Sequence, residues 1–134
     1  MFKYIESAYQ SIEAMAIINP KLSNNRTIQI EIEQRNKGPI PHVHVYHDKS
    51  RNPKKCSYVR LDKAEYSTHH KDNIPLPKNL KDEFVEIMET PFRRYTSGYE
   101  QAVETWADTY ESGSFDKFPT DVNGDLEMPD YRQL

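Results

Sequence analysis

The residues of this sequence best suited to chemistry are two histidines, His42 and His44, in the run Pro41-His42-Val43-His44-Val45. Alternate residues of an extended strand project to the same side, about 7 Å apart at the backbone. Imidazole gains and loses a proton near neutral pH, so this pair could serve as a general acid and a general base. The same spacing would also allow both rings to bind one metal ion.

A metal site would need a third and a fourth ligand. The carboxylates of Glu31 and Glu33, or the adjacent pair His69 and His70, could supply them, but no spacing in the sequence fixes such a set. We therefore expect neither a metal ion nor a cofactor.

The metal-free alternative is cleavage of an RNA phosphodiester. In the following β-rich run, residues 56–61, Tyr58 and Arg60 alternate with residues of the other face. Histidine for proton transfer, arginine for phosphate charge and tyrosine for positioning suit this reaction without a metal. The hypothetical catalytic set is therefore His42, His44, Tyr58 and Arg60. Tyr46 and the carboxylates of Glu31 and Glu33 are expected to share the same face.

A basic loop separates the two β-rich runs. Its cationic residues, which surround Pro53, are Lys49, Arg51, Lys54 and Lys55. Such a loop could contact the phosphates of a nucleic acid. Charge is also uneven along the chain: residues 1–80 hold 13 Lys and Arg against 8 Asp and Glu, whereas residues 81–134 hold 5 against 13. A net charge of −3 therefore does not exclude a charged binding surface.

The periodicity of apolar residues predicts the elements that must hold these side chains. Spacing of three and four residues predicts a first helix from Phe2 through Ala16, which should end near Asn19, before Pro20. Alternation predicts strands over 27–33, 41–48 and 56–61. Helical spacing returns over 80–88 and from 95 or 98 to 111, and residues 112–134 read as loop or as a packed irregular tail.

These elements predict a single α+β domain over residues 1–134. The expected architecture is a small antiparallel sheet of about three strands, covered on one face by helices from both ends of the chain. A length of 134 residues suits one domain, and 36% hydrophobic and 29% charged residues exclude disorder throughout and a membrane span. Only one cysteine is present and no apolar leader is visible, so a cytoplasmic location is expected.

The segment from Thr27 to about Met88 resembles a widespread family of small bacterial domains of unknown function. The resemblance rests on Pro41-His42-Val43-His44-Val45, which is similar to that family's Pro-Pro-His-Phe-His-Val strand, and on the Leu76-Pro77 step before a helix. Ile40 and Val43 depart from that motif. Members are cytosolic and are often encoded beside a small partner in modules of toxin–antitoxin type, so the resemblance implies a similar context.

Two classes of function stay open. The first is a binding or regulatory module of a toxin–antitoxin-like or defence-related system, with a protein partner and with nucleic acid as a further partner of the basic loop. The second is a small metal-independent ribonuclease or phosphodiesterase that uses His42 and His44. The first is preferred because the sequence holds no complete catalytic set of diagnostic spacing.

Overall fold

The computed structural model describes residues 15–33, 40–67, 73–109 and 118–134. It contains a four-stranded antiparallel sheet in the order β2-β3-β4-β5. The strands are β2 (Met15–Ile17), β3 (Gln29–Glu33), β4 (His42–Tyr46) and β5 (Cys56–Arg60). The fold is α+β, as the sequence predicts, and the sheet has one strand more than the three expected. None of the described helices is both long and apolar enough to span a membrane.

The extra strand corrects the helix predicted at the start of the chain. Instead of continuing that helix, Met15–Ile17 pairs with β3, with Ala16 opposite Ile32. Pairing with a complete neighbouring strand outweighs local helical periodicity, as tertiary contacts often do. Residues 2–14 of the predicted helix lie outside the described residues. Pro20 begins a short helix, α2 (Pro20–Ser23), because a proline is accommodated in the first turn of a helix.

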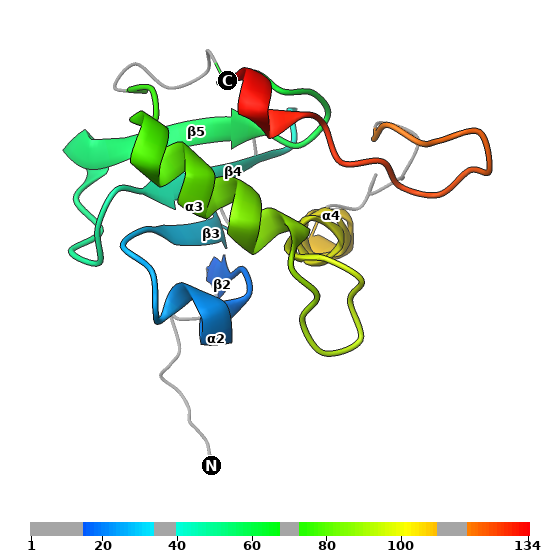
Figure 1. Cartoon of the computed structure of the whole chain (residues 1–134), viewed down its shortest axis with the longest axis horizontal. Helices are drawn as coiled ribbons and strands as arrows, with labels where there is room; N and C mark the ends of the chain where they lie inside the picture. The colour runs from blue at the N-terminus through cyan, green and yellow to red at the C-terminus, as the bar shows by residue number, and fades with distance from the viewer. Residues whose placement is uncertain (1–14, 34–39, 68–72, 110–117) are drawn as a thin grey trace.

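One face of the sheet forms the hydrophobic core. The isoleucines that alternate along β3 and the valines of β4 are completely buried, as the alternation predicts. Helix α3 (Lys78–Glu89) lies across this face in Figure 1 and contributes Phe84, Ile87 and Met88 to the same core. Burial of this apolar surface is the main favourable term that holds α3 on the sheet.

Helix α4 (Gly98–Thr109) packs closely against α3. Ser97 caps its first turn by accepting a hydrogen bond from the backbone N–H of Glu100 at 3.0 Å, and the carboxylate of Glu100 accepts one from Thr96 at 2.7 Å. A Cβ at Gly98 would lie 2.3 Å from the carbonyl oxygen of Ile87 in α3. Only glycine therefore permits the two helices to approach this closely.

The described part of the C-terminal segment, residues 118–134, is irregular but packed. Phe118 and Tyr131 are buried, and Tyr131 opens a short 3-10 helix, η4 (Tyr131–Gln133). The Tyr131 ring lies edge to face on Phe84 at 5.0 Å between centroids, and its hydroxyl donates a 2.6 Å hydrogen bond to the carbonyl of Arg60. This segment therefore closes the core beside α3.

Candidate functional site

The strand register places the four candidate catalytic residues on one face of the sheet, as their alternation predicts. His44 lies between Glu31 of β3 and Tyr58 of β5, and His42 lies opposite Arg60. This polar face is the one that α3 leaves uncovered in Figure 1, but its histidines, Glu31 and Tyr58 are buried, and Arg60 is half-buried. Glu31 is 2% exposed, His42 2% and His44 6%.

The two imidazoles lie within an aromatic cluster. Their rings stack with centroids 5.3 Å apart, Tyr58 meets His44 edge-on at 4.8 Å, and Trp106 of α4 lies 5.4 Å from His42. The Nδ1 atom of His42 lies 2.8 Å from the carbonyl oxygen of Ile40. Since a carbonyl oxygen can only accept, Nδ1 carries the proton, and this hydrogen bond fixes the orientation of the ring.

The fourth candidate, Arg60, is engaged by a carboxylate. Its Nε and Nη2 atoms donate to the two carboxylate oxygens of Asp62, each at 2.8 Å. Burial raises the pKa of Asp62, but the hydrogen bonds and charge of Arg60 outweigh burial and hold that pKa below its usual value. A phosphate would therefore compete with Asp62 for the charge of this guanidinium.

A buried carboxylate fixes the basic loop to the same face. Arg51 donates from Nε and Nη2 to the two oxygens of Glu31, at 2.7 and 2.9 Å, and Gln29 donates to the same group. The Glu31 side chain is 2% exposed, whereas that of Arg51 is 45% exposed. Arg51 also lies over the ring of Tyr46, at 5.3 Å. The ion pair joins β3 to a loop twenty positions further along the chain.

The other basic residues of the loop differ in what their ammonium groups contact. The ammonium group of Lys49 donates to the backbone carbonyls of Ser23, at 2.7 Å, and of Ile28. Asn52 caps the 3-10 helix η2 (Pro53–Lys55) by accepting from the Lys54 backbone at 2.9 Å. Lys54 and Lys55 are exposed. All four residues predicted to bind nucleic acid are thus exposed, but the charged groups of Lys49 and Arg51 are bound to other groups of the protein.

The remaining chemical groups near the sheet have structural roles. Nε2 of His47 lies 2.8 Å from Oγ of Ser57, whose hydroxyl donates to the carbonyl of Ile74. Ser57 is fully buried, so this contact does not present a nucleophile. Burial lowers the pKa of His47 and raises that of the Cys56 thiol to about 12.

No metal site can be assembled from the part of the chain that the structure describes. It contains no group of three or more His, Cys, Asp or Glu side chains that could hold an ion. His69 and His70, which the sequence offers as additional ligands, lie outside the described residues.

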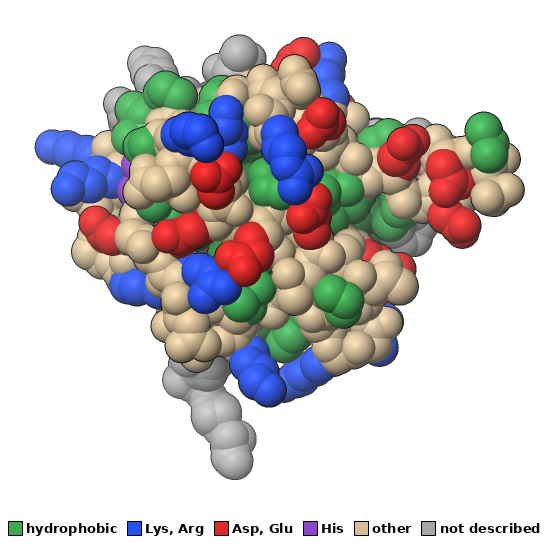
Figure 2. Space-filling view, in the orientation of Figure 1, with side chains coloured by type: hydrophobic (Ala, Val, Ile, Leu, Met, Phe, Trp, Pro, Cys, Tyr) green, Lys and Arg blue, Asp and Glu red, His purple; other side chains and the backbone are tan. Residues whose placement is uncertain are grey.

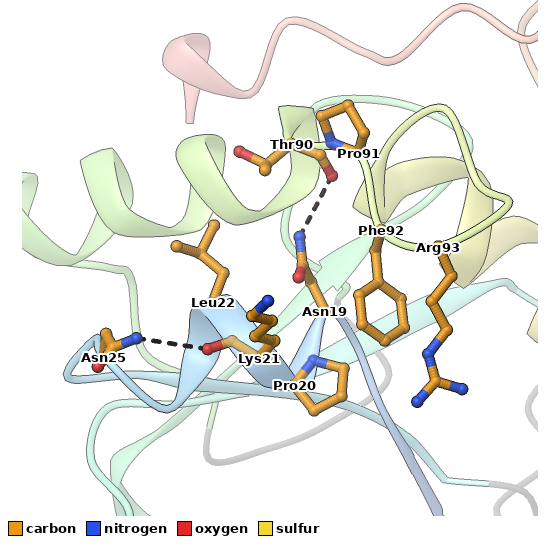
Figure 3. Close-up of a pocket in the computed structure, with 9 residues that line it drawn as sticks. All are labelled: Asn19, Pro20, Lys21, Leu22, Asn25, Thr90, Pro91, Phe92 and Arg93. Atoms are coloured by element: carbon orange, nitrogen blue, oxygen red, sulfur yellow. Dashed lines mark hydrogen bonds between the residues drawn. The ribbon is translucent and has the colours of Figure 1, made fainter.

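The sequence does not indicate the cavity that the structure shows between α2 and the loop after α3 (Figure 3). Its volume is about 610 Å³, within the range of ligand-binding pockets. It is lined by Asn19, Pro20, Lys21, Leu22, Asn25, Thr90, Pro91, Phe92 and Arg93. The two segments are some seventy positions apart and neither carries a motif, so only the proline and the basic residue that each contains could have pointed to it.

Neither a protein-family model, nor a curated protein, nor a solved structure matches this chain. The functional inference therefore depends on the described residues. They present two accessible basic features, the loop end at Lys54 and Lys55 and the rim of the cavity, and one buried polar feature, the histidine pair.

Proposed function

We propose that this protein is a binding or regulatory module that contacts an acidic protein partner through its basic loop. The observation that carries the proposal is the state of the predicted catalytic set. His42 and His44 are buried, and Arg60 is held by Asp62, whereas the loop that carries Lys54 and Lys55 is exposed. Catalysis needs groups that can touch a substrate, and binding needs only the accessible loop.

The basic loop is also rigid, which favours binding. The Lys49 contacts, the Arg51–Glu31 pair and the Asn52 cap fix the middle of the loop, and Asp48 accepts from the Ser50 backbone at 2.9 Å just before it. A loop already ordered in the free protein loses less conformational entropy when a partner binds. Lys54 and Lys55 are therefore presented from an ordered backbone.

An acidic protein segment fits this loop better than a nucleic acid does. Affinity for a nucleic acid grows with the number of phosphates that the protein neutralises. Here the ammonium group of Lys49 binds backbone carbonyls and Arg51 is paired with Glu31, so Lys54 and Lys55 remain, on a chain with a net charge of −3. The resemblance noted from the sequence favours a cytoplasmic, toxin–antitoxin-like or defence-related setting in a bacterium or mobile element, where a small protein partner is the natural ligand.

The ribonuclease alternative keeps one specific observation in its favour. The hydrogen bond from Nδ1 of His42 to the Ile40 carbonyl orients the ring as catalytic histidines are commonly oriented. In this alternative, His42 or His44 would accept the proton of the attacking hydroxyl. It requires the stacked rings to become accessible to RNA.

Fluorescence anisotropy with two labelled probes, an acidic peptide and a short single-stranded RNA of equal charge, tests the proposal. We expect the peptide to bind more tightly than the RNA, with an affinity that falls as salt rises. The double substitution Lys54→Glu with Lys55→Glu should abolish peptide binding. The control Lys63→Glu, which reverses an exposed charge at the other end of β5, should leave it unchanged. Equal peptide binding by both variants would contradict the proposal, and tighter binding of the RNA would favour nucleic acid as the partner.

A further inference from the structure

The cavity between α2 and the loop after α3 has fixed walls. The side-chain amide of Asn19 donates to the Thr90 carbonyl at 3.2 Å, which joins the two walls directly (Figure 3). The backbone N–H of Asn19 donates to Gln101 of α4 at 2.8 Å, and Gln101 donates to the carbonyl of Ile17 at 3.1 Å. Asn19 is 2% exposed, so these contacts are shielded from water. The cavity is therefore formed before any ligand enters.

The lining of the cavity selects for an apolar group that carries negative charge. Its apolar side chains are Pro20, Leu22, Pro91 and Phe92. Lys21 and Arg93 stand among them and are exposed, and none of the nine lining residues carries a carboxylate. Within the described ranges, neither Lys21 nor Arg93 forms an ion pair with an acidic side chain, unlike Arg26, Arg94 and Arg132.

The same chain presents a segment of the complementary kind, residues 119–127, which we call the acidic finger. In Figure 1 it projects from the body of the molecule, and in Figure 2 acidic side chains lie along it, with a hydrophobic one at its tip. Val122 is 101% exposed, the one large hydrophobic side chain so exposed among the described residues. Asp125, near the turn, and Glu127, at the base of the finger, are exposed as well.

Hydrogen bonds hold the acidic finger in one shape. Thr120 and Leu126 form a bridge, and the backbone N–H of Asp121 donates to the Asp125 carbonyl at 2.8 Å. One carboxylate oxygen of Asp121 accepts from the backbone of Asn123 at 2.8 Å and of Asp125 at 3.1 Å. Because the turn is already ordered, it loses little further conformational entropy when its exposed apolar side chain is bound.

We propose that the acidic finger of one molecule inserts into the cavity of a second copy of this chain. Val122 would pack against Pro20 and Phe92, while Asp125 and Glu127 would approach Lys21 and Arg93. The full exposure of Val122 shows that the finger does not occupy its own cavity. The contact joins two different surfaces, so it gives either a reciprocal pair or a head-to-tail chain of copies. This self-association is independent of the partner proposed for the basic loop.

Analytical ultracentrifugation over a range of protein concentrations tests the proposal. The wild-type mass should rise with concentration, and Val122→Asp should weaken association by at least about tenfold, because it removes the buried apolar contact. Val122→Leu should keep it. Asp125→Lys with Glu127→Lys reverses the finger and spares the Asp121 turn, and Lys21→Glu with Arg93→Asp reverses the cavity. Each double variant alone should be monomeric.

The decisive sample is an equimolar mixture of the two charge-reversed variants. There the unaltered finger of one variant meets the unaltered cavity of the other, and the positive finger meets the negative cavity, so the mixture should associate although neither component does. Variants that had lost their folds could not give this recovery. Asp108→Lys, an exposed reversal on α4, serves as the matched control and should associate like the wild type. The proposal fails if the wild type stays monomeric up to about 1 mM. It also fails if Val122→Asp associates normally, or if the mixture stays monomeric.

Discussion

Substitution of Arg51 by alanine should destabilise the fold even though the side chain is nearly half exposed. The loss leaves the Glu31 carboxylate, 2% exposed, with Gln29 as its remaining described donor. Breaking a fully buried ion pair costs about 3–5 kcal/mol. Because the Arg51 side chain is 45% exposed, water can reach the vacated position, so we expect a loss of about 2–3 kcal/mol.

Equilibrium urea unfolding, followed by the fluorescence of Trp106, measures this loss. Three further variants separate the ion pair from other effects. Arg51 has a φ of 56°, in the left-handed region, so Arg51→Gly relieves backbone strain and should be about 1 kcal/mol more stable than Arg51→Ala. The double variant Glu31→Gln with Arg51→Ala should be roughly 1 kcal/mol more stable than the sum of the two single losses predicts. Lys54→Ala, in the same loop, should stay within about 0.5 kcal/mol of the wild type.

A free energy of unfolding for Arg51→Ala that equals that of Lys54→Ala would refute this reasoning. It would mean that the Glu31 carboxylate is solvated adequately without its arginine, so that the loop is not fixed by the ion pair. The reasoning would also be contradicted if the stability losses of the two single substitutions simply added in the double variant.

Three other predictions concern the core. In the same unfolding assay, Gly98→Ala should destabilise the protein by roughly 2 kcal/mol or more, because its Cβ would meet the Ile87 carbonyl oxygen at 2.3 Å. Gly124→Ala, which adds a Cβ in open space at a φ of 85°, should cost about 1 kcal/mol. Equal losses would contradict the close contact between the two helices. Tyr131→Phe should lower the free energy of unfolding by about 1–2 kcal/mol, because the Arg60 carbonyl loses its tyrosine donor. A melting temperature unchanged from wild type would argue against this hydrogen bond. Iodoacetamide should alkylate Cys56 at pH 8 at least about 100-fold more slowly in the folded than in the urea-unfolded protein. The reason is that thiolate is the reactive form and burial raises the pKa of this thiol to about 12. Similar rates would show that the thiol is accessible.

The sheet could be predicted from the sequence because its signal is local. Ile28, Ile30 and Ile32 alternate with polar residues, so their side chains lie in the core whatever else the chain does. The first strand could not be predicted in this way. Met15–Ile17 is only three residues long and is stabilised by pairing with β3, a contact that no local pattern reveals.

The candidate site shows the same division between local and long-range information. Alternation correctly placed His42, His44, Tyr58 and Arg60 on one face, since it fixes the direction of each side chain. It did not indicate that this face is buried, because the residues that engage it come from elsewhere in the chain. Arg51 reaches back to Glu31, and Trp106 arrives from α4. Charged and histidine side chains on a strand normally indicate a solvent-exposed face. Here partners from distant parts of the chain take the place of water.

Incubation of the wild-type protein at stoichiometric amounts with the labelled single-stranded RNA, followed by a denaturing gel, tests the central claim most directly. The claim is that the histidine face is structural and that the protein acts by binding. It predicts RNA of unchanged length after prolonged incubation. Cleavage by the wild type that is lost in His42→Asn or His44→Asn variants of wild-type stability would contradict it and establish the ribonuclease alternative.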